Sequence, residues 1–189
     1  MPIKVFIDQG HNPTGFHDTG AEAFGLTAQE VNFEVGICLA TLLNNDPRFE
    51  ARLSRPTPET VIGTDSVSSV EERVAMANEW PADYLISIQC NYNFDPEVNG
   101  TEVYVFRNFT SSSWLAQNVV REISDVVETK NNGVFVNPYI YLLRYARMPA
   151  IMVYLAYITN QLDAQKLRDE PTKFASGIYV GLLRFLGYA

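Results

Sequence analysis

Side chains able to bind a metal or attack a substrate follow two predicted strands. The segment IKVFID (residues 3–8) is short, apolar and β-branched, which is typical of a buried strand, and His11 comes soon after it. The segment DYLISI (residues 83–88) has the same character and is followed by Gln89 and Cys90. In α/β proteins, ligands gather beyond the carboxyl ends of strands. This arrangement predicts a site that combines His11 with the residues after DYLISI.

Cysteine chemistry is not favoured at this place. Cys90 would be a nucleophile only beside an activating base, and a free cysteine in an apolar run is more often buried filler. The other cysteine, Cys38, falls in an apolar helical pattern. Two isolated cysteines form neither a disulfide framework nor a CxxC metal knuckle.

The elements that must position these residues alternate in the order β-α-β-α-β-β-α-β-β-α. We expect an α/β fold of one domain, with a twisted, mixed, mostly parallel sheet of about six strands and helices on both faces. Expected strands are 3–8, 49–56, 83–88, 100–107, 139–144 and 150–158, and expected helices are 27–45, 70–80, 112–127 and one from 171. Capping-box spacings at Thr27 and Ser69 mark the first two helix starts.

Length and charge limit the classes of function. The chain has 189 residues, 47% of them hydrophobic, and a formal net charge of -8. Such a chain can build its own core, and its acidity argues against nucleic acid or an anionic membrane as partner. No apolar run is long enough for a membrane span. No signal peptide is apparent, so localisation stays unknown, and a cytoplasmic protein or release to the cell wall by a non-classical route both remain open.

Several segments, taken in order, resemble one family. The chain contains IDQGHN, TGAEAFGLTAQEVNF, RVAMANEWPADYLISIQCN, NGTEVYVFR and MPAIMVYLAYITN. Together they resemble the zinc-dependent N-acetylmuramoyl-L-alanine amidases of bacterial cell walls and phage lysins. The resemblance covers nearly the whole chain without large gaps, so we expect residues 1–189 to form one amidase-like domain.

The resemblance implies where a catalytic site would lie. In this family a zinc ion is held by two His and one Glu with an open fourth position, and another Glu acts as general base. The first His ligand falls on His11, which is kept. The Glu ligand falls on Ala28, the second His ligand on Gln89 and the catalytic Glu on Tyr154.

These replacements predict that zinc is bound weakly or not at all. Ala28 has no donor atom, and the neutral amide of Gln89 is a poor zinc ligand. The phenol of Tyr154 titrates near pH 10, too high for a base at neutral pH. We therefore expect no cofactor and an inactive relative of the amidases, whose partner is peptidoglycan, a muropeptide, or a cell-wall or sporulation protein.

An active zinc amidase with a rearranged site around His11 is the alternative. It would need donors from the long loop after the first strand, which offers His17, Asp18 and Glu22. Glu30 lies about 200° around the helix from Ala28 and should point away.

Other residues are expected to contact substrate or to line the cleft. Asn91, Glu102 and Arg144 match polar positions of the family near its substrate. Phe24 and Tyr92, with Tyr154, suggest a cleft that aromatic rings fill or line. Arg73 and Asn78, on a helix beside the sheet, are interpreted as structural.

Overall fold

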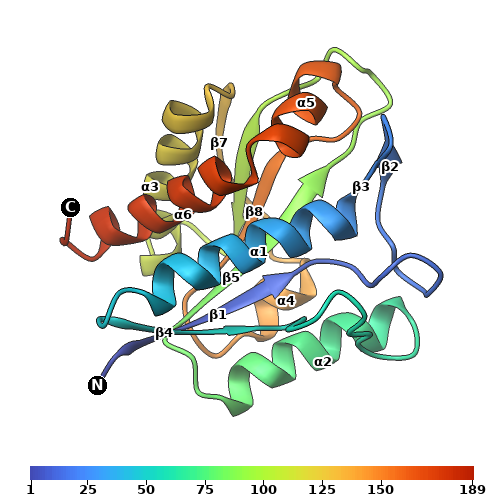
Figure 1. Cartoon of the computed structure of the whole chain (residues 1–189). Coiled ribbons are helices and arrows are strands. Elements are labelled where there is room, and N and C mark those ends of the chain that lie inside the picture. Colours follow the sequence, from blue (N-terminus) through green and yellow to red (C-terminus); the bar gives the residue numbers. More distant parts are fainter.

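A six-stranded sheet runs through the middle of the molecule, and the computed structural model describes all of residues 1–189 (Figure 1). In spatial order its strands are β4 (Phe49–Leu53), β1 (Ile3–Gln9), β5 (Tyr84–Asn91), β8 (Ala150–Tyr157), β6 (Thr101–Val105) and β7 (Asn131–Val136). Neighbours are parallel except β8 and β6, which are antiparallel. The predicted α/β class and mixed, mostly parallel sheet are confirmed.

Helices cover both faces of the sheet. The helices α1 (Ala28–Asn44), α3 (Ser111–Val127) and α6 (Pro171–Phe185) pack over one face, where the larger hydrophobic core lies. The opposite face carries α2 (Ser66–Glu79) and the short α4 (Tyr141–Tyr145) over a smaller core. The remaining helix, α5 (Gln161–Asp169), follows β8 (Figure 1). None of the helices is both long and apolar enough to cross a bilayer.

Side-chain alternation along the strands decides what reaches each face. On β5, Ile86, Ile88 and Cys90 are buried in the larger core. The intervening Ser87 and Gln89 therefore point to the α2 and α4 face. This smaller core does not reach the carboxyl ends of the strands. Polar side chains therefore occupy those ends, next to the loops that follow the strands.

Two predicted elements are wrong in type or position, and two observed elements were not predicted. Residues 139–144 were expected to be a strand, but Tyr141–Tyr145 form α4, in which the adjacent Leu142 and Leu143 are both buried. The sixth strand is instead β7, and α5 was not expected. The helix α2 begins earlier than predicted, because Asp65 and Ser68 form its capping box and Ser69 lies inside it.

The long loop after β1 contains a small hairpin of β2 (Glu22–Ala23) and β3 (Leu26–Thr27). Its turn has left-handed backbone at Phe24 and Gly25, with φ of 52° and 72°. Arg168 of α5 donates a 2.6 Å hydrogen bond to the carbonyl oxygen of Phe24. The loop is thereby tied to the C-terminal part of the chain and leads directly into α1.

Candidate functional site

The carboxyl ends of β1 and β5 meet at a cavity of about 220 Å³. Its wall includes Asp8, Gly10, His11, Asp18 and Gln89, together with Met152 of β8, Val70 and Arg73 of α2, and Ile140, Tyr141 and Leu142 at α4. This is the strand-end position where the sequence placed the site. His11 and Gln89, far apart in the chain, are brought together there.

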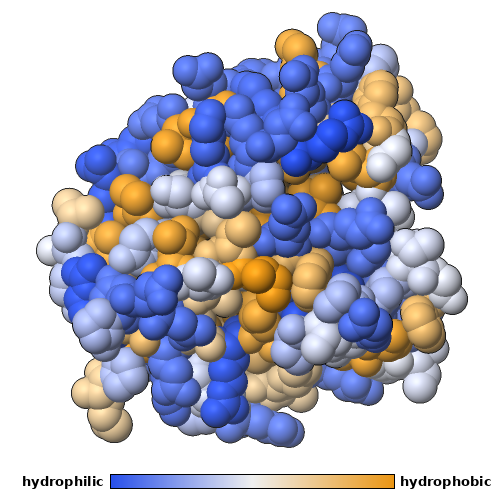
Figure 2. Space-filling model, viewed as in Figure 1, coloured by the Kyte–Doolittle hydropathy of each residue, from blue (hydrophilic) through white to orange (hydrophobic).

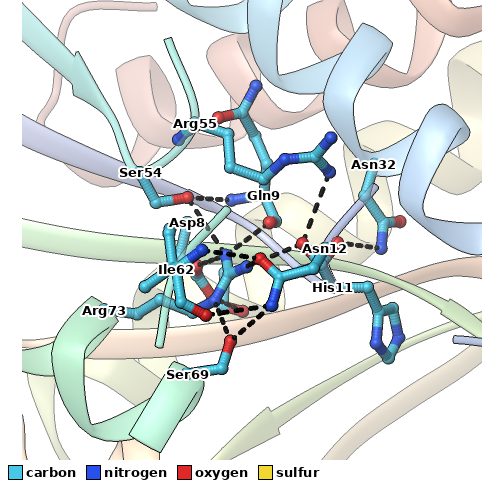
Figure 3. A network of polar contacts seen from close by, with 12 residues as sticks. Asp8, Gln9, His11, Asn12, Asn32, Ser54, Arg55, Ile62, Ser69 and Arg73 are labelled. Atoms are coloured by element: carbon cyan, nitrogen blue, oxygen red, sulfur yellow. Dashed lines mark hydrogen bonds and ion pairs between the residues drawn. The ribbon is translucent and has the colours of Figure 1, made fainter. Parts of the chain in front are cut away.

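The backbone of His11 is held by buried arginines. Its φ is 73°, a left-handed conformation that is uncommon for a residue with a side chain. Its carbonyl oxygen accepts a 2.6 Å hydrogen bond from Arg73 and a 3.3 Å one from Arg55. Figure 3 shows the imidazole directed away from these guanidinium groups. The network therefore fixes the loop and leaves the ring free for other contacts.

Only one carboxylate balances the two arginines. Arg73 forms a 2.8 Å ion pair with Asp8, and both side chains are 2% exposed. Asp8 also accepts a 2.7 Å hydrogen bond from Ser87. Arg55 bonds to carbonyl and amide oxygens, and its Nε has no partner. Burial, and then repulsion by Arg73, lowers the pKa of Arg55 to about 10. The sequence pattern indicates a structural role for Arg73, whereas it gives no signal that singles out Arg55.

The imidazole of His11 contacts Asp18 and lies, with Ala28, beside Gly20. Its Nδ1 lies 2.8 Å from Oδ1 of Asp18. A side-chain carbon on Gly20 would lie 2.8 Å from Nε2 of His11 and 2.9 Å from Cβ of Ala28. His11 and Ala28 thus converge on the same glycine. The nitrogen that Asp18 leaves free lies beside Gly20, whose other near neighbour is the methyl group of Ala28.

Gln89 lies across the backbone of Gly10. A Cβ at Gly10 would come within 2.2 Å of both Nε2 and Oε1 of Gln89, so only glycine allows this approach. The amide nitrogen of Gln89 donates a 3.2 Å hydrogen bond to Ser87. The uncharged side chain of Gln89 therefore lies against Gly10 at the cavity where β1 and β5 end.

Tyr154 lies between Gln89 and Glu102 on adjacent strands. The register pairs Gln89 with Tyr154 across β5 and β8, and Tyr154 with Glu102 across β8 and β6. Burial, followed by the charge of Glu102, raises the pKa of Tyr154 above its ordinary value. The phenol is consequently protonated at neutral pH and is a hydrogen-bond donor rather than a base.

Of the three residues expected to contact substrate, Asn91 and Glu102 lie together, and Arg144 lies elsewhere. Asn91 donates a hydrogen bond to the carboxylate of Glu102, which also accepts one of 3.2 Å from Tyr157. Arg144 is exposed on α4 and faces a separate hollow of about 410 Å³ beside Arg107 and the start of α3. Asn78 donates to the carbonyl oxygen of Tyr145, a structural contact.

The remaining loop residues do not gather around His11. His17 contacts the side chain of Asn12 and lies 3.1 Å from the carbonyl oxygen of Ile62. Glu22 is exposed on β2, and exposed Glu30 accepts a hydrogen bond from the hydroxyl of Thr27. Of the loop residues considered as replacement donors, the structure brings only Asp18 to His11.

Cys90 and two of the expected cleft aromatics lie outside the cavity. Cys90 is buried on the opposite face, and burial raises the pKa of its thiol, so a thiolate is disfavoured. Phe24 is exposed at the hairpin turn, and Tyr92 is exposed with its ring 5.1 Å from that of Phe94. The expectation that both line or fill the cleft is wrong, because the loops carry them outward.

The donor set does not fit the zinc site that the resemblance implies. No group of three or more His, Cys, Asp or Glu side chains is arranged to hold a metal ion. Asp18 contacts the imidazole ring itself. This is the position of a carboxylate that orients a metal-binding histidine, and it is not the position of a second metal ligand. One imidazole nitrogen of His11, beside Gly20, is then the only strong metal donor that these residues offer.

The sequence matches the family model for N-acetylmuramoyl-L-alanine amidase (Amidase_3) over residues 5–184. It is 31% identical to N-acetylmuramoyl-L-alanine amidase LytC of Bacillus subtilis (strain 168), across 96% of this chain and 35% of LytC. It is 30% identical to N-acetylmuramoyl-L-alanine amidase CwlM of Bacillus licheniformis, across 88% of this chain and 61% of that protein. The chain therefore spans only part of the length of these curated relatives.

A solved structure agrees with this relationship over the whole fold. The crystal structure of N-acetylmuramoyl-L-alanine amidase from Clostridium difficile 630 superimposes with a TM-score of 0.86 and 28% identity, and the match covers 98% of this chain and 97% of that one. Sequence family and fold coincide, and the chain belongs to the N-acetylmuramoyl-L-alanine amidase family.

Proposed function

We propose that this member of the peptidoglycan amidase family binds its ligand without cleaving it. The observation that supports this most is the set of side chains at the strand ends, where His11 and Ala28 lie beside Gly20 and Gln89 is paired with Tyr154. The ligand would be peptidoglycan or a muropeptide. A cell-wall or sporulation protein is the other partner that suits a relative of these enzymes.

Amide hydrolysis needs an activated water and a base, and neither is supplied by these residues. The raised pKa of Tyr154 keeps its proton on the phenol. Gln89 is neutral, and the Glu102 carboxylate already accepts hydrogen bonds from Asn91 and Tyr157. Nε2 of His11, the ring nitrogen that Asp18 leaves free, lies close to Gly20. Binding without turnover is the chemistry these groups support best.

Zinc-dependent hydrolysis around His11 is the second candidate, and one contact favours it. A metal-binding histidine usually donates its other ring N–H to a carboxylate, and Asp18 occupies that place beside Nδ1. The ring would then offer Nε2 to a metal. This candidate requires further donors to move in from the loop.

Metal content and turnover separate the two candidates. We would purify the protein without chelator, measure zinc per chain, and incubate it with muropeptides while following release of L-alanyl peptides. The proposal expects well under one zinc per chain and no release above a blank. Stoichiometric zinc together with peptide release would refute it and support the rearranged site.

Restoring the family's side chains tests the assignment of positions. The variant Ala28→Glu/Gln89→His/Tyr154→Glu should bind zinc in a calorimetric titration, while the parent does not. The matched control is Ala28→Gln/Gln89→His/Tyr154→Glu, which keeps the size of the residue at 28 but removes its charge, and it should bind zinc more weakly. A folded triple variant with no zinc affinity would show that these positions do not correspond to the family's ligands.

A further inference from the structure

A hollow of about 410 Å³ lies at the end of the sheet opposite to the His11 cavity. Because β6 runs antiparallel to β8, the carboxyl end of β6 lies beside the amino end of β8. The hollow is lined by residues that follow β6, by the start of α3, and by the segment from α4 to Ala150, the first residue of β8. It shares no residue with the His11 cavity and is therefore a separate concave site.

Two arginines without acidic partners line this hollow, which we call the arginine hollow. Arg107 follows β6 and Arg144 lies on α4, and both are exposed. Neither side chain forms an ion pair, and no Asp or Glu lines the hollow. The guanidinium of Arg144 lies 5.7 Å from the centre of the Tyr145 ring, a cation–π contact that restricts its position. Two positive charges without a neutralising carboxylate attract an anion to the arginine hollow.

Uncharged hydrogen-bond donors lie beside the two guanidinium groups. The capping box of α3 uses the backbone N–H groups of Thr110 and Ser113. Those of Ser111 and Ser112, which line the hollow, have no acceptor within the chain. The hydroxyl of Ser112 accepts a 3.2 Å hydrogen bond from the backbone of Ala150 and keeps its own proton for another acceptor. An oxyanion in the hollow would thus meet hydrogen-bond donors as well as positive charge.

The distribution of charge along the chain also favours an anionic ligand at this end. The whole chain has 22 acidic and 14 basic residues. Residues 103–121 and 129–162 supply every residue that lines the arginine hollow, and they contain five Arg or Lys and no Asp or Glu. The charge of these two segments is therefore opposite in sign to that of the whole molecule.

We propose that the arginine hollow binds a phosphate group, either as the free ion or as a small phosphate monoester. A phosphate dianion can pair with both guanidinium groups and still accept hydrogen bonds from hydroxyl and backbone N–H donors. A carboxylate carries one charge and would neutralise only one of the two arginines. Arg144, expected from the family resemblance to contact substrate, belongs to this second site instead.

Titration of the isotope-labelled protein, followed by amide chemical shifts in NMR spectra, tests the site with glycerol 3-phosphate and inorganic phosphate as separate probes. We expect saturable shifts at Ser111 and Ser112 with at least one probe. Arg107→Gln and Arg144→Gln should each weaken the affinity by about tenfold, because each removes one charged hydrogen-bond donor. The matched control Arg147→Gln removes the same charge from an exposed arginine that does not line the hollow, and it should change the affinity by less than about twofold.

Comparison of the two probes identifies the source of the phosphate. Tighter binding of glycerol 3-phosphate assigns the site to monoesters, and equal or tighter binding of inorganic phosphate assigns it to the free ion. No saturable shift with either probe would overturn the proposal. Acetate of equal affinity would also overturn it, as would equal losses of affinity in Arg147→Gln and Arg144→Gln. None of these results bears on zinc content or peptide release, so this proposal and the proposed function fail independently.

Discussion

The loop that carries His11 depends on one buried cation. Arg73 bonds to Asp8, to the carbonyl oxygen of Gln9 at 2.6 Å and to that of His11 at 2.6 Å. We predict that Arg73→Met lowers the free energy of unfolding by about 3–5 kcal/mol, because it leaves Asp8 charged and buried without its partner. Urea denaturation measures this, with circular dichroism as the signal.

Arg121→Met is the matched control for that measurement. Arg121 makes a 3.2 Å ion pair with Glu122, but its side chain is 52% exposed. Solvent screens such a pair, so the control should cost about 0–1 kcal/mol. Similar losses in the two variants would show that the buried network does not stabilise the fold.

At the level of single residues, the sequence predicted which side chains come together better than what surrounds them. His11 and Gln89, singled out through family resemblance, line the same cavity, and His11 and Ala28 lie beside the same glycine, Gly20. Arg55 was missed because an arginine at the end of an alternating strand is usually solvated. Its burial depends on loop carbonyls that no local pattern identifies.

The contact between α3 and α6 is close because two glycines face a helix backbone. A Cβ on Gly181 would lie 2.6 Å from Cα of Val119, and one on Gly177 would lie 2.7 Å from Cα of Ile123. Glycine to alanine in a helix ordinarily stabilises by about 1 kcal/mol. Here we predict that Gly181→Ala destabilises by about 1–3 kcal/mol, since backbone cannot move aside as a side chain would.

Thermal unfolding of Gly181→Ala and of an exposed control tests the sign of this effect. Thr172→Ala, near the start of the same helix, should change the free energy of unfolding by less than about 0.5 kcal/mol. A stabilised Gly181→Ala variant would mean that the two helices can separate at little cost.

Elements with strong periodicity were predictable, and weakly patterned ones were not. The helix α1 and the strands β1, β5 and β8 have long apolar patterns and lie where expected. The edge strand β7 begins with two asparagines and a glycine and is half exposed, so it lacks the signal of a buried strand. Residues 139–144 have strand-like composition, yet the five residues of α4 fold as a helix because they bury two adjacent leucines against α2.

At the scale of the whole molecule, buried phenols and a buried thiol determine how the stability of the fold changes at alkaline pH. Burial raises the pKa values of Tyr84, Tyr104, Tyr154 and Tyr157, and that of Cys90, whose ordinary value is 9.0. The folded chain keeps these protons while the unfolded chain releases them. Stability is therefore fully present below about pH 9 and falls as pH rises beyond 9 to 10.

Each such group can contribute a slope of up to about 1.4 kcal/mol per pH unit. Arg55, with its pKa lowered to about 10, acts in the opposite direction but is a single group. We predict that Tyr154→Phe reduces the loss of stability between pH 10 and 11, as measured by urea denaturation at each pH. An unchanged slope in this variant would contradict the burial of Tyr154.

In the view of Figure 2, hydrophilic side chains predominate over the α5 end of the molecule, while apolar atoms are scattered over the rest of the view and gather in its middle.

The place of β8 in the sheet has a consequence for synthesis of the chain. It lies between β5 and β6, both of which leave the ribosome before it. Until residues 150–157 emerge, the nascent chain has two unpaired strand edges, and Gln89 and Glu102 have no Tyr154 between them. A ribosome stalled shortly before β8 would therefore hold a chain whose β5 and β6 edges are both unpaired and open to association with other chains.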